Sequence, residues 1–280
     1  MQKIGDVKTL SLGRWVKGSG RIADIATSDV DVCSPDQKIR DVLDMFLERH
    51  SHMPVADKKS HVHGMLTSTD MLRVLGGWGE FKRVQPKNRP AVKVGKVMSR
   101  HILHIDRNSD IGQALDSFKK HRKGAYPVLH HGKLEGIVTE SDIVKLINGR
   151  TGVKVSELMV RKPLVAYEKY TVSDVSKMLV MGGFKRLPVV RKNELVGMVS
   201  PREVLKFLQE NKLLEKLERQ KDSLRTVMNK DFCTANPEDD VYEAIKTMLE
   251  KGVGGLPVVS GNNELAGIFT QRDIVDALVI

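Results

Sequence analysis

Four copies of one seven-residue pattern constrain this 280-residue chain more than any other feature. Each copy reads Gly, two apolar residues, a hydroxyl residue, two variable residues and an acid, and the copies begin at Gly64, Gly136, Gly197 and Gly267. A short apolar run that ends in a hydroxyl residue, with an acid three residues later, is typical of a buried strand that leads into a capped helix. We therefore expect the chain to form the same strand-to-helix corner four times.

The segments around the corners repeat as well. An amphipathic helix pattern precedes each corner, and its first apolar position lies 15, 16, 16 and 16 residues before the proline of the next strand. This regularity indicates one supersecondary unit copied four times. The expected fold class is α+β (α/β mixed), with four β-α-β-β-α repeats at 22–77, 96–150, 154–210 and 224–280 after an N-terminal leader at 1–21. Residues 76–95 are expected to form an irregular linker, and 209–223 to extend the last helix of the third repeat.

The corners also carry candidate binding residues. Unpaired backbone N–H groups at a helix N-terminus favour anions, and a carboxylate can accept hydrogen bonds from two neighbouring hydroxyls. A hydroxyl residue and an acid at such a corner therefore suit a ribose next to a phosphate, although helix capping alone explains the same residue types. Arg272 could either contact a phosphate or pair with a surface acid. Glu203 departs from the pattern because it replaces the aspartate of the other corners. The candidates are Thr67, Thr69, Asp70, Thr139, Ser141, Asp142, Thr270, Arg272 and Asp273.

The order of these motifs resembles a known family. A Val-Met lead-in, an x-Pro-Val-Val strand and the Gly-h-h-Thr-x-x-Asp corner follow one another, as in tandem cystathionine-beta-synthase (CBS) domains, over about residues 22–280. The resemblance implies two Bateman modules, 1–150 and 151–280, each made of two repeats paired through their sheets. The architecture is similar to that of the gamma subunit of the AMP-activated protein kinase. The function that it implies is regulation by AMP, ADP, ATP or S-adenosylmethionine, bound in clefts between paired repeats.

The same resemblance implies roles for individual positions. The corner acids would hold ribose hydroxyls, and the corner threonines ribose or phosphate. First-strand residues would border the base, namely Val32, His104, Val165 and Thr234. Basic residues before the second strand would face phosphates, namely His52, Arg122, Lys123, Lys185 and Arg186. The second repeat is the best match and the fourth is next, so we expect two occupied clefts.

Other classes of function find little support in the sequence. No nucleotide-hydrolase, dinucleotide or nucleophile motif is present, and the corner acids are single, so we expect no enzyme and no catalytic cofactor. The paired histidines His50-x-His52 and His61-x-His63 lack a neighbouring cysteine or acid at fixed spacing, so no metal site is expected. No apolar run approaches the ~20 residues of a membrane span, which favours a cytoplasmic protein.

Two alternative functions remain open, and the protein partner is not identified by the sequence. Residues 1–150 carry a net charge of +9, and 81–100 hold seven basic residues and no acid, which favours a nucleic-acid-binding or scaffold protein that uses Lys82, Arg83, Lys87 and Arg89. An S-adenosylmethionine sensor is the other. The sensor of adenine nucleotides is preferred because Phe81 is the only aromatic residue in that stretch. It would act on an unknown protein partner, and a homodimer could form through the apolar faces of the closing helices, which carry Ile143, Val144, Leu146, Ile147, Ile274, Val275 and Leu278.

Overall fold

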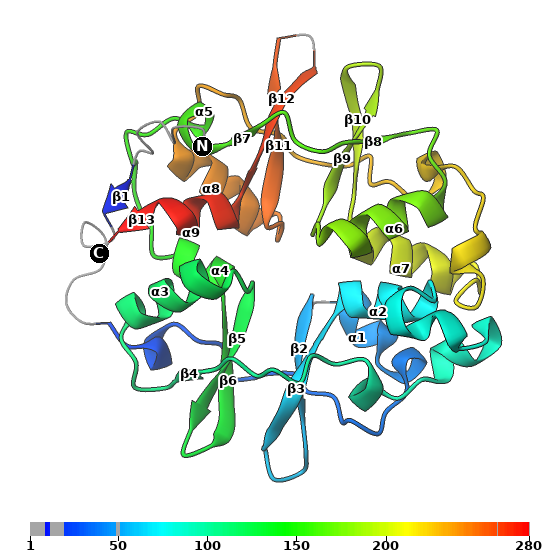
Figure 1. Cartoon of the computed structure of the whole chain (residues 1–280). Helices are drawn as coiled ribbons and strands as arrows, with labels where there is room; N and C mark the ends of the chain where they lie inside the picture. The colour runs from blue at the N-terminus through cyan, green and yellow to red at the C-terminus, as the bar shows by residue number, and fades with distance from the viewer. Residues whose placement is uncertain (1–8, 12–19, 49–50, 262, 280) are drawn as a thin grey trace, which may run out of the picture.

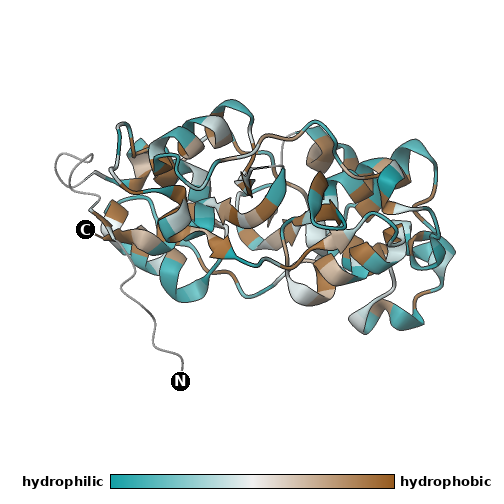
Figure 2. Ribbon diagram, turned by 90° about the horizontal axis from the view of Figure 1, so that it is seen from above, coloured by the Kyte–Doolittle hydropathy of each residue, from teal (hydrophilic) through white to brown (hydrophobic). Residues whose placement is uncertain are grey.

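The computed structural model describes residues 9–11, 20–48, 51–261 and 263–279. In this part of the chain the four repeats form a ring, with the helices turned toward the middle and the strand hairpins toward the outside (Figure 1). Seen from above, the ring is a flattened body (Figure 2). The mixed fold class and the four repeats that the sequence predicts are confirmed.

Each repeat contains a helix, an antiparallel hairpin and a closing helix. The first repeat has η3 (Ile39–Asp41), α1 (Leu43–Glu48), β2 (His52–Ala56), β3 (Val62–Thr67) and α2 (Ser68–Leu75). The second has β4 (Ile105–Asp106), α3 (Ile111–His121), β5 (Ala125–His130), β6 (Lys133–Thr139) and α4 (Glu140–Val144). The third has β8 (Ala166–Tyr167), α6 (Val172–Gly182), β9 (Leu187–Arg191), β10 (Glu194–Val199) and α7 (Pro201–Glu210). The fourth has α8 (Val241–Glu250), β11 (Gly255–Ser260), β12 (Glu264–Thr270) and α9 (Gln271–Ala277).

The first strand of each repeat is short. β4 and β8 pair in parallel with β5 and β9. In the first and fourth repeats this strand is reduced to single parallel bridges, Cys33 to Val55 and Ala235 to Val258. Strand β1 (Leu10–Ser11), from the expected leader, pairs in parallel with β13 (Leu278–Val279), so the two ends of the described chain meet.

The segment before each repeat packs on the other repeat of its module. Thr27 bridges Ile137, and Ser99 bridges Met65, so the first two repeats exchange their lead-ins. In the second module, β7 (Val160–Arg161) pairs with β12, and Asn229 bridges Met198. This exchange joins the two repeats of each module, because each lead-in packs against the strand that leads into the corner of the other repeat.

Two hydrophobic cores cross the boundary between the modules. One contains the helices of the first and third repeats, and the other those of the second and fourth. Helix α2 packs on α6 and α7, and α4 packs on α9. The apolar faces expected to support a homodimer therefore pack against each other within one chain.

Two local expectations need correction. The helix of the third repeat ends at Glu210 and does not continue to residue 223; Leu217 instead anchors the segment in the first core through a short 3-10 turn, η7 (Leu217–Arg219). The linker at 76–95 is built from 3-10 helices: η4 (Gly79–Arg83), η5 (Pro86–Ala91) and the start of η6 (Val94–Lys96). Trp15 and most of the leader lie outside the described residues. α5 (Val155–Leu158), η2 (Ile22–Asp24) and η8 (Leu224–Thr226) complete the lead-ins.

Candidate functional site

The acid of each corner caps its helix. Oδ2 of Asp142 accepts hydrogen bonds from the backbone N–H of Thr139 at 2.9 Å and from its hydroxyl at 2.7 Å. Asp70 and Asp273 make the same pair of bonds with Thr67 and Thr270. Capping therefore engages one carboxylate oxygen, and the other is left for a different neighbour.

A cavity of about 260 Å³ lies beside the corner of the second repeat. Its lining combines that corner with two segments of the first repeat, so that the cavity is shared by the paired repeats. The lining residues are Thr27, Asp29, Val30, Asp31, Ser51, His52, Ile137, Thr139, Ser141, Asp142 and Lys145. Four predicted site residues, His52, Thr139, Ser141 and Asp142, thus lie around one space.

Among the described residues that line this cavity, carboxylates outnumber cationic side chains. Asp29, Asp31 and Asp142 contribute carboxylates, and Lys145 is the cation of the lining, with its Nζ 3.0 Å from Oδ1 of Asp142. Burial, followed by the charges of Lys185 and Lys123, lowers the pKa of His52 to about 3. His52 is therefore neutral near pH 7, so it can share a hydrogen bond with a phosphate but cannot neutralise one.

A cluster of charges at the junction of three repeats adjoins the cavity. Glu140 follows Thr139, and only 6% of its surface is exposed. Its Oε2 lies 2.8 Å from Nζ of Lys185 in the third repeat, and its Oε1 contacts the guanidinium of Arg272 in the fourth. Arg186 covers Gly254 and Gly255, where added Cβ atoms would meet its guanidinium at 2.8 and 2.5 Å.

Arg272 also holds the second and fourth repeats together. Its guanidinium donates hydrogen bonds to the carbonyls of Phe118 and Lys123, both at 2.7 Å. Arg202, the matching residue of the third repeat, donates to the carbonyls of Leu47 and Glu48 in the first repeat. Of the two uses predicted for Arg272, the structure shows contact with acids, but the principal acid is the buried Glu140 and not a surface residue.

The other corners are arranged differently. Burial raises the pKa of Asp70 and of Asp273, against the hydrogen bonds from their threonines, which lower it. Nη1 of Arg73 lies 3.0 Å from Oδ1 of Asp70, in the position that Lys145 has beside Asp142. In the fourth repeat this position is occupied by Asp276, whose Oδ2 lies 3.2 Å from Nη1 of Arg122. Arg122, predicted to face a phosphate, is therefore paired with an acid. In the third repeat Oε2 of Glu203 accepts from the N–H of Ser200 at 2.7 Å, so the longer acid still caps the helix.

The remaining predicted residues lie outside the 260 Å³ cavity. Val32, His104 and Thr234 are exposed, Val165 is half-buried and Thr69 is half-buried beside Asp70. The sequence did not predict the other lining residues, which are Thr27, Asp29, Val30, Asp31, Ser51, Ile137 and Lys145, or the adjoining Glu140. A hint was available for Lys145, because it lies three residues after the corner acid on the same helix face.

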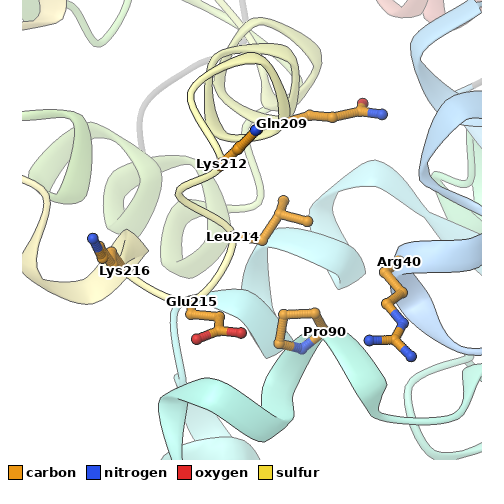
Figure 3. Close-up of a pocket in the computed structure, with 7 residues that line it drawn as sticks. All are labelled: Arg40, Pro90, Gln209, Lys212, Leu214, Glu215 and Lys216. Atoms are coloured by element: carbon orange, nitrogen blue, oxygen red, sulfur yellow. The ribbon is translucent and has the colours of Figure 1, made fainter.

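A second cavity, of about 300 Å³, lies where the first repeat meets the segment after α7. Figure 3 shows Gln209 and Lys212 above this cavity and Pro90 beside Glu215 below it, with Leu214 between them. Arg40 and Lys216 lie at opposite sides of it, and Glu215 is among the lining residues, so the cations do not converge on one point. This cavity contains none of the residues predicted to bind a ligand.

The basic stretch 81–100 is only partly available to a nucleic acid. Lys82, Arg83 and Lys87 are exposed, but Arg89 has only 2% of its surface exposed. Its Nη1 lies 2.9 Å from Oε2 of Glu218, and its Nε donates to the carbonyl of Val84. The expectation that Arg89 contacts nucleic acid is therefore wrong, because this side chain fixes the linker to the second module.

Of the two histidine pairs in the sequence, His61 and His63 are both described, whereas His50 of the first pair lies outside the described residues. His61 and His63 both approach Oδ2 of Asp57, at 3.2 and 3.3 Å, on the first hairpin. Across residues 9–11, 20–48, 51–261 and 263–279, no group of three or more metal-binding side chains gathers.

Within the same ranges, no helix has the length and apolar character needed to cross a membrane.

Comparison with known proteins identifies the repeats. A family model described as CBS domain matches residues 22–77, 94–149, 155–210 and 224–280. The uncharacterized protein MJ1225 of Methanocaldococcus jannaschii is 25% identical over 246 residues, which are 81% of this chain and 87% of that protein. Its crystal structure, named as a candidate archaeal homologue of g-AMPK, has the same fold, with a TM-score of 0.84 and 24% identity over 91% of this chain and 99% of that one.

For two further relatives, the match to this chain covers a smaller share of the relative than it does for MJ1225. The uncharacterized protein MJ1404 of the same organism is 26% identical over 275 residues, which are 91% of this chain and 61% of that protein. The A-adding tRNA nucleotidyltransferase of Aquifex aeolicus is 29% identical over 174 residues, which are 60% of this chain and 20% of the enzyme. Most of that enzyme therefore lies outside the match.

Proposed function

Because the chain belongs to the CBS domain family, we propose that it is a non-catalytic sensor of an adenine nucleotide, AMP, ADP or ATP. The ligand would bind in the cavity between the first two repeats and act on a separate protein partner by changing the contacts between repeats. A cytoplasmic location and an action on such a partner remain predictions. The homodimer also remains a prediction, and the helix faces first considered for it are buried within the chain.

One observation carries this proposal. The corner hydroxyls and acid of the second repeat share a cavity with His52 and the segment around Val30 of the first. Oδ2 of Asp142 is engaged in capping, and within the described part of the chain Oδ1 faces the exposed Lys145. This second oxygen is the group that would accept hydrogen bonds from a ribose diol.

Titration calorimetry with a matched pair of variants tests the proposal. Asp142→Asn removes the charge at the cavity, while Asp174→Asn removes it from an equivalent capping box at the exposed start of α6, where Oδ2 of Asp174 accepts from the Thr171 hydroxyl at 2.7 Å. Each loses a similar capping contribution of about 1 kcal/mol. We expect one of AMP, ADP and ATP to bind the wild type, and Asp142→Asn to weaken it at least about tenfold, since hydrogen bonds to a charged group are worth roughly 1.5–3 kcal/mol each.

The control separates binding from capping. Asp174→Asn should bind the nucleotide as the wild type does. Equal losses in the two variants would mean that Asp142 acts only on stability. Absence of binding to the wild type would contradict the sensor itself.

S-adenosylmethionine is a second candidate because of the charge of the cavity. Asp29 and Asp142 outnumber Lys145 among the described lining residues, and carboxylates favour a ligand with an ammonium and a sulfonium group over one with several phosphates. The same titration should therefore include S-adenosylmethionine. Binding of this compound in preference to all three nucleotides would replace the first candidate by the second.

A further inference from the structure

Glu140 connects the cavity to the opposite module. It lies between Thr139 and Ser141, which both line the cavity, and it is the buried residue of the three. Lys185 reaches its carboxylate from the loop between α6 and β9, and Arg272 reaches it from α9. One carboxylate of the second repeat is thus contacted by cations of the third and the fourth.

These contacts do not satisfy every group at the junction. Oε1 of Glu140 lies against Arg272 without the geometry of a hydrogen bond, and Nη1 of Arg186 is buried without an acceptor among the described residues. Burial lowers the pKa of Arg186, against the charges of Glu140, Glu203 and Asp273, which raise it. Buried donors in native proteins normally have acceptors, so the junction has the character of a site for a further anion.

The cavity leads to this junction past His52. A Cβ atom added at Gly124 would meet both Nζ of Lys185 and the ring of His52, the latter at 3.1 Å, so the two side chains lie around the same point. Lys185 is 47% exposed, and its long side chain can turn toward a ligand without leaving its loop. A group that extends from the cavity beyond His52 therefore meets Lys185 next.

We propose, building on the proposed function, that Glu140 occupies the place of a ligand phosphate and that a nucleotide must displace it from Lys185. A phosphate has more negative charge than a carboxylate and three acceptor oxygens, so it can compete for Lys185 and also supply an acceptor to Arg186. Since the Glu140–Lys185 contact joins the first module to the second, its displacement changes the contact between modules. An adenosine without phosphate fills the cavity and leaves this contact in place.

The test compares AMP with adenosine by calorimetry on the full chain. Glu140→Gln keeps the shape of the side chain and removes its charge, so the preference for AMP over adenosine should rise by about tenfold, as expected when a competing ion pair is lost. Lys185→Gln should bring the two affinities close together. Glu238→Gln, which removes the acid of the exposed Lys154–Glu238 pair, is the matched control and should keep the wild-type preference.

Each outcome has a definite meaning. An unchanged preference in Glu140→Gln, with adenosine still bound, would overturn the competition and leave the sensor intact. If Glu140→Gln does not fold, a wild-type preference in Lys185→Gln would overturn it instead. Failure of adenosine, AMP, ADP and ATP alike to bind the wild type would contradict the proposed function, and with it this inference.

Discussion

At each aspartate corner, capping engages one oxygen of the acid, and the proposed ligand would use the other. Oδ2 of Asp142 is held by Thr139, whereas Oδ1 faces Lys145. A cation beside Oδ1 also occurs at Asp70, which has Arg73. Helix capping therefore explains the position of Oδ2 but gives no role to Oδ1.

His52 makes stability depend on pH. Its pKa falls from 6.5 to about 3 on folding, so below pH 6.5 the unfolded chain binds a proton that the folded chain does not. The contribution of His52 to the free energy of unfolding is fully present above pH 6.5 and is lost as the pH falls toward 3. Between pH 7 and pH 5 the free energy of unfolding should fall by about 1 to 2 kcal/mol, the upper value applying to a fully shielded histidine.

Urea unfolding at the two pH values measures this effect. His52→Gln should flatten the dependence, because the variant has no group that takes up the proton. His104→Gln removes an exposed histidine and should leave the wild-type slope. Equal slopes for wild type and His52→Gln would show that His52 titrates normally in the folded chain.

At the scale of elements, the motif glycines are explained by the exchanged lead-ins. A Cβ atom at Gly64 would lie 2.6 Å from the carbonyl oxygen of Ser99, and one at Gly267 would lie 2.8 Å from that of Val160. At Gly197 the nearest atom is Sδ of Met228, at 2.8 Å, and the backbone oxygen of Asn229 is 3.1 Å away. The repeated glycine thus permits the backbone of a neighbouring repeat to approach.

These distances predict unequal costs of substitution. Gly64→Ala forces a backbone carbonyl to move and should lower the free energy of unfolding by about 1 to 3 kcal/mol. Gly197→Ala meets mainly a flexible methionine side chain that can move aside, so its cost should be smaller. In both variants alanine also restricts the unfolded chain, which offsets roughly 0.4 to 1 kcal/mol of the loss. Denaturant unfolding of the two variants gives the comparison. An equal or larger loss for Gly197→Ala would contradict the role given to the lead-in backbone.

The sequence predicts the parts of this architecture that depend on local pattern. Helix faces, strand prolines and corner caps recur at fixed spacing, so the four repeats and their corners can be recognised. The exchange of lead-ins cannot, because nothing in Val97-Met98 indicates which repeat it will cover. Glu140 was missed for a related reason: it occupies a variable position of the pattern, and its burial depends on cations from two distant repeats.

At the scale of the whole molecule, the two modules do not have separate cores. The first and third repeats share one core, and the second and fourth share the other. The chain should therefore unfold as one cooperative unit, although its motifs divide it near residue 150.

Tryptophan fluorescence can test this coupling, because Trp15 and Trp78 both belong to the first half. Leu208→Ala opens a cavity in the third repeat and should lower stability by about 2 to 5 kcal/mol. The fluorescence transition should shift together with the circular dichroism transition. A shift in circular dichroism alone would mean that the two halves unfold independently.

The central claim is that an adenine nucleotide binds between the first two repeats. A crystal structure tests it most directly when it is determined with a saturating concentration of whichever of AMP, ADP and ATP binds most tightly. We predict the ribose hydroxyls within hydrogen-bonding distance of Oδ1 of Asp142 and the phosphate next to Lys185. A nucleotide bound away from Asp142, or absent from the cavity between the first two repeats, would contradict the claim.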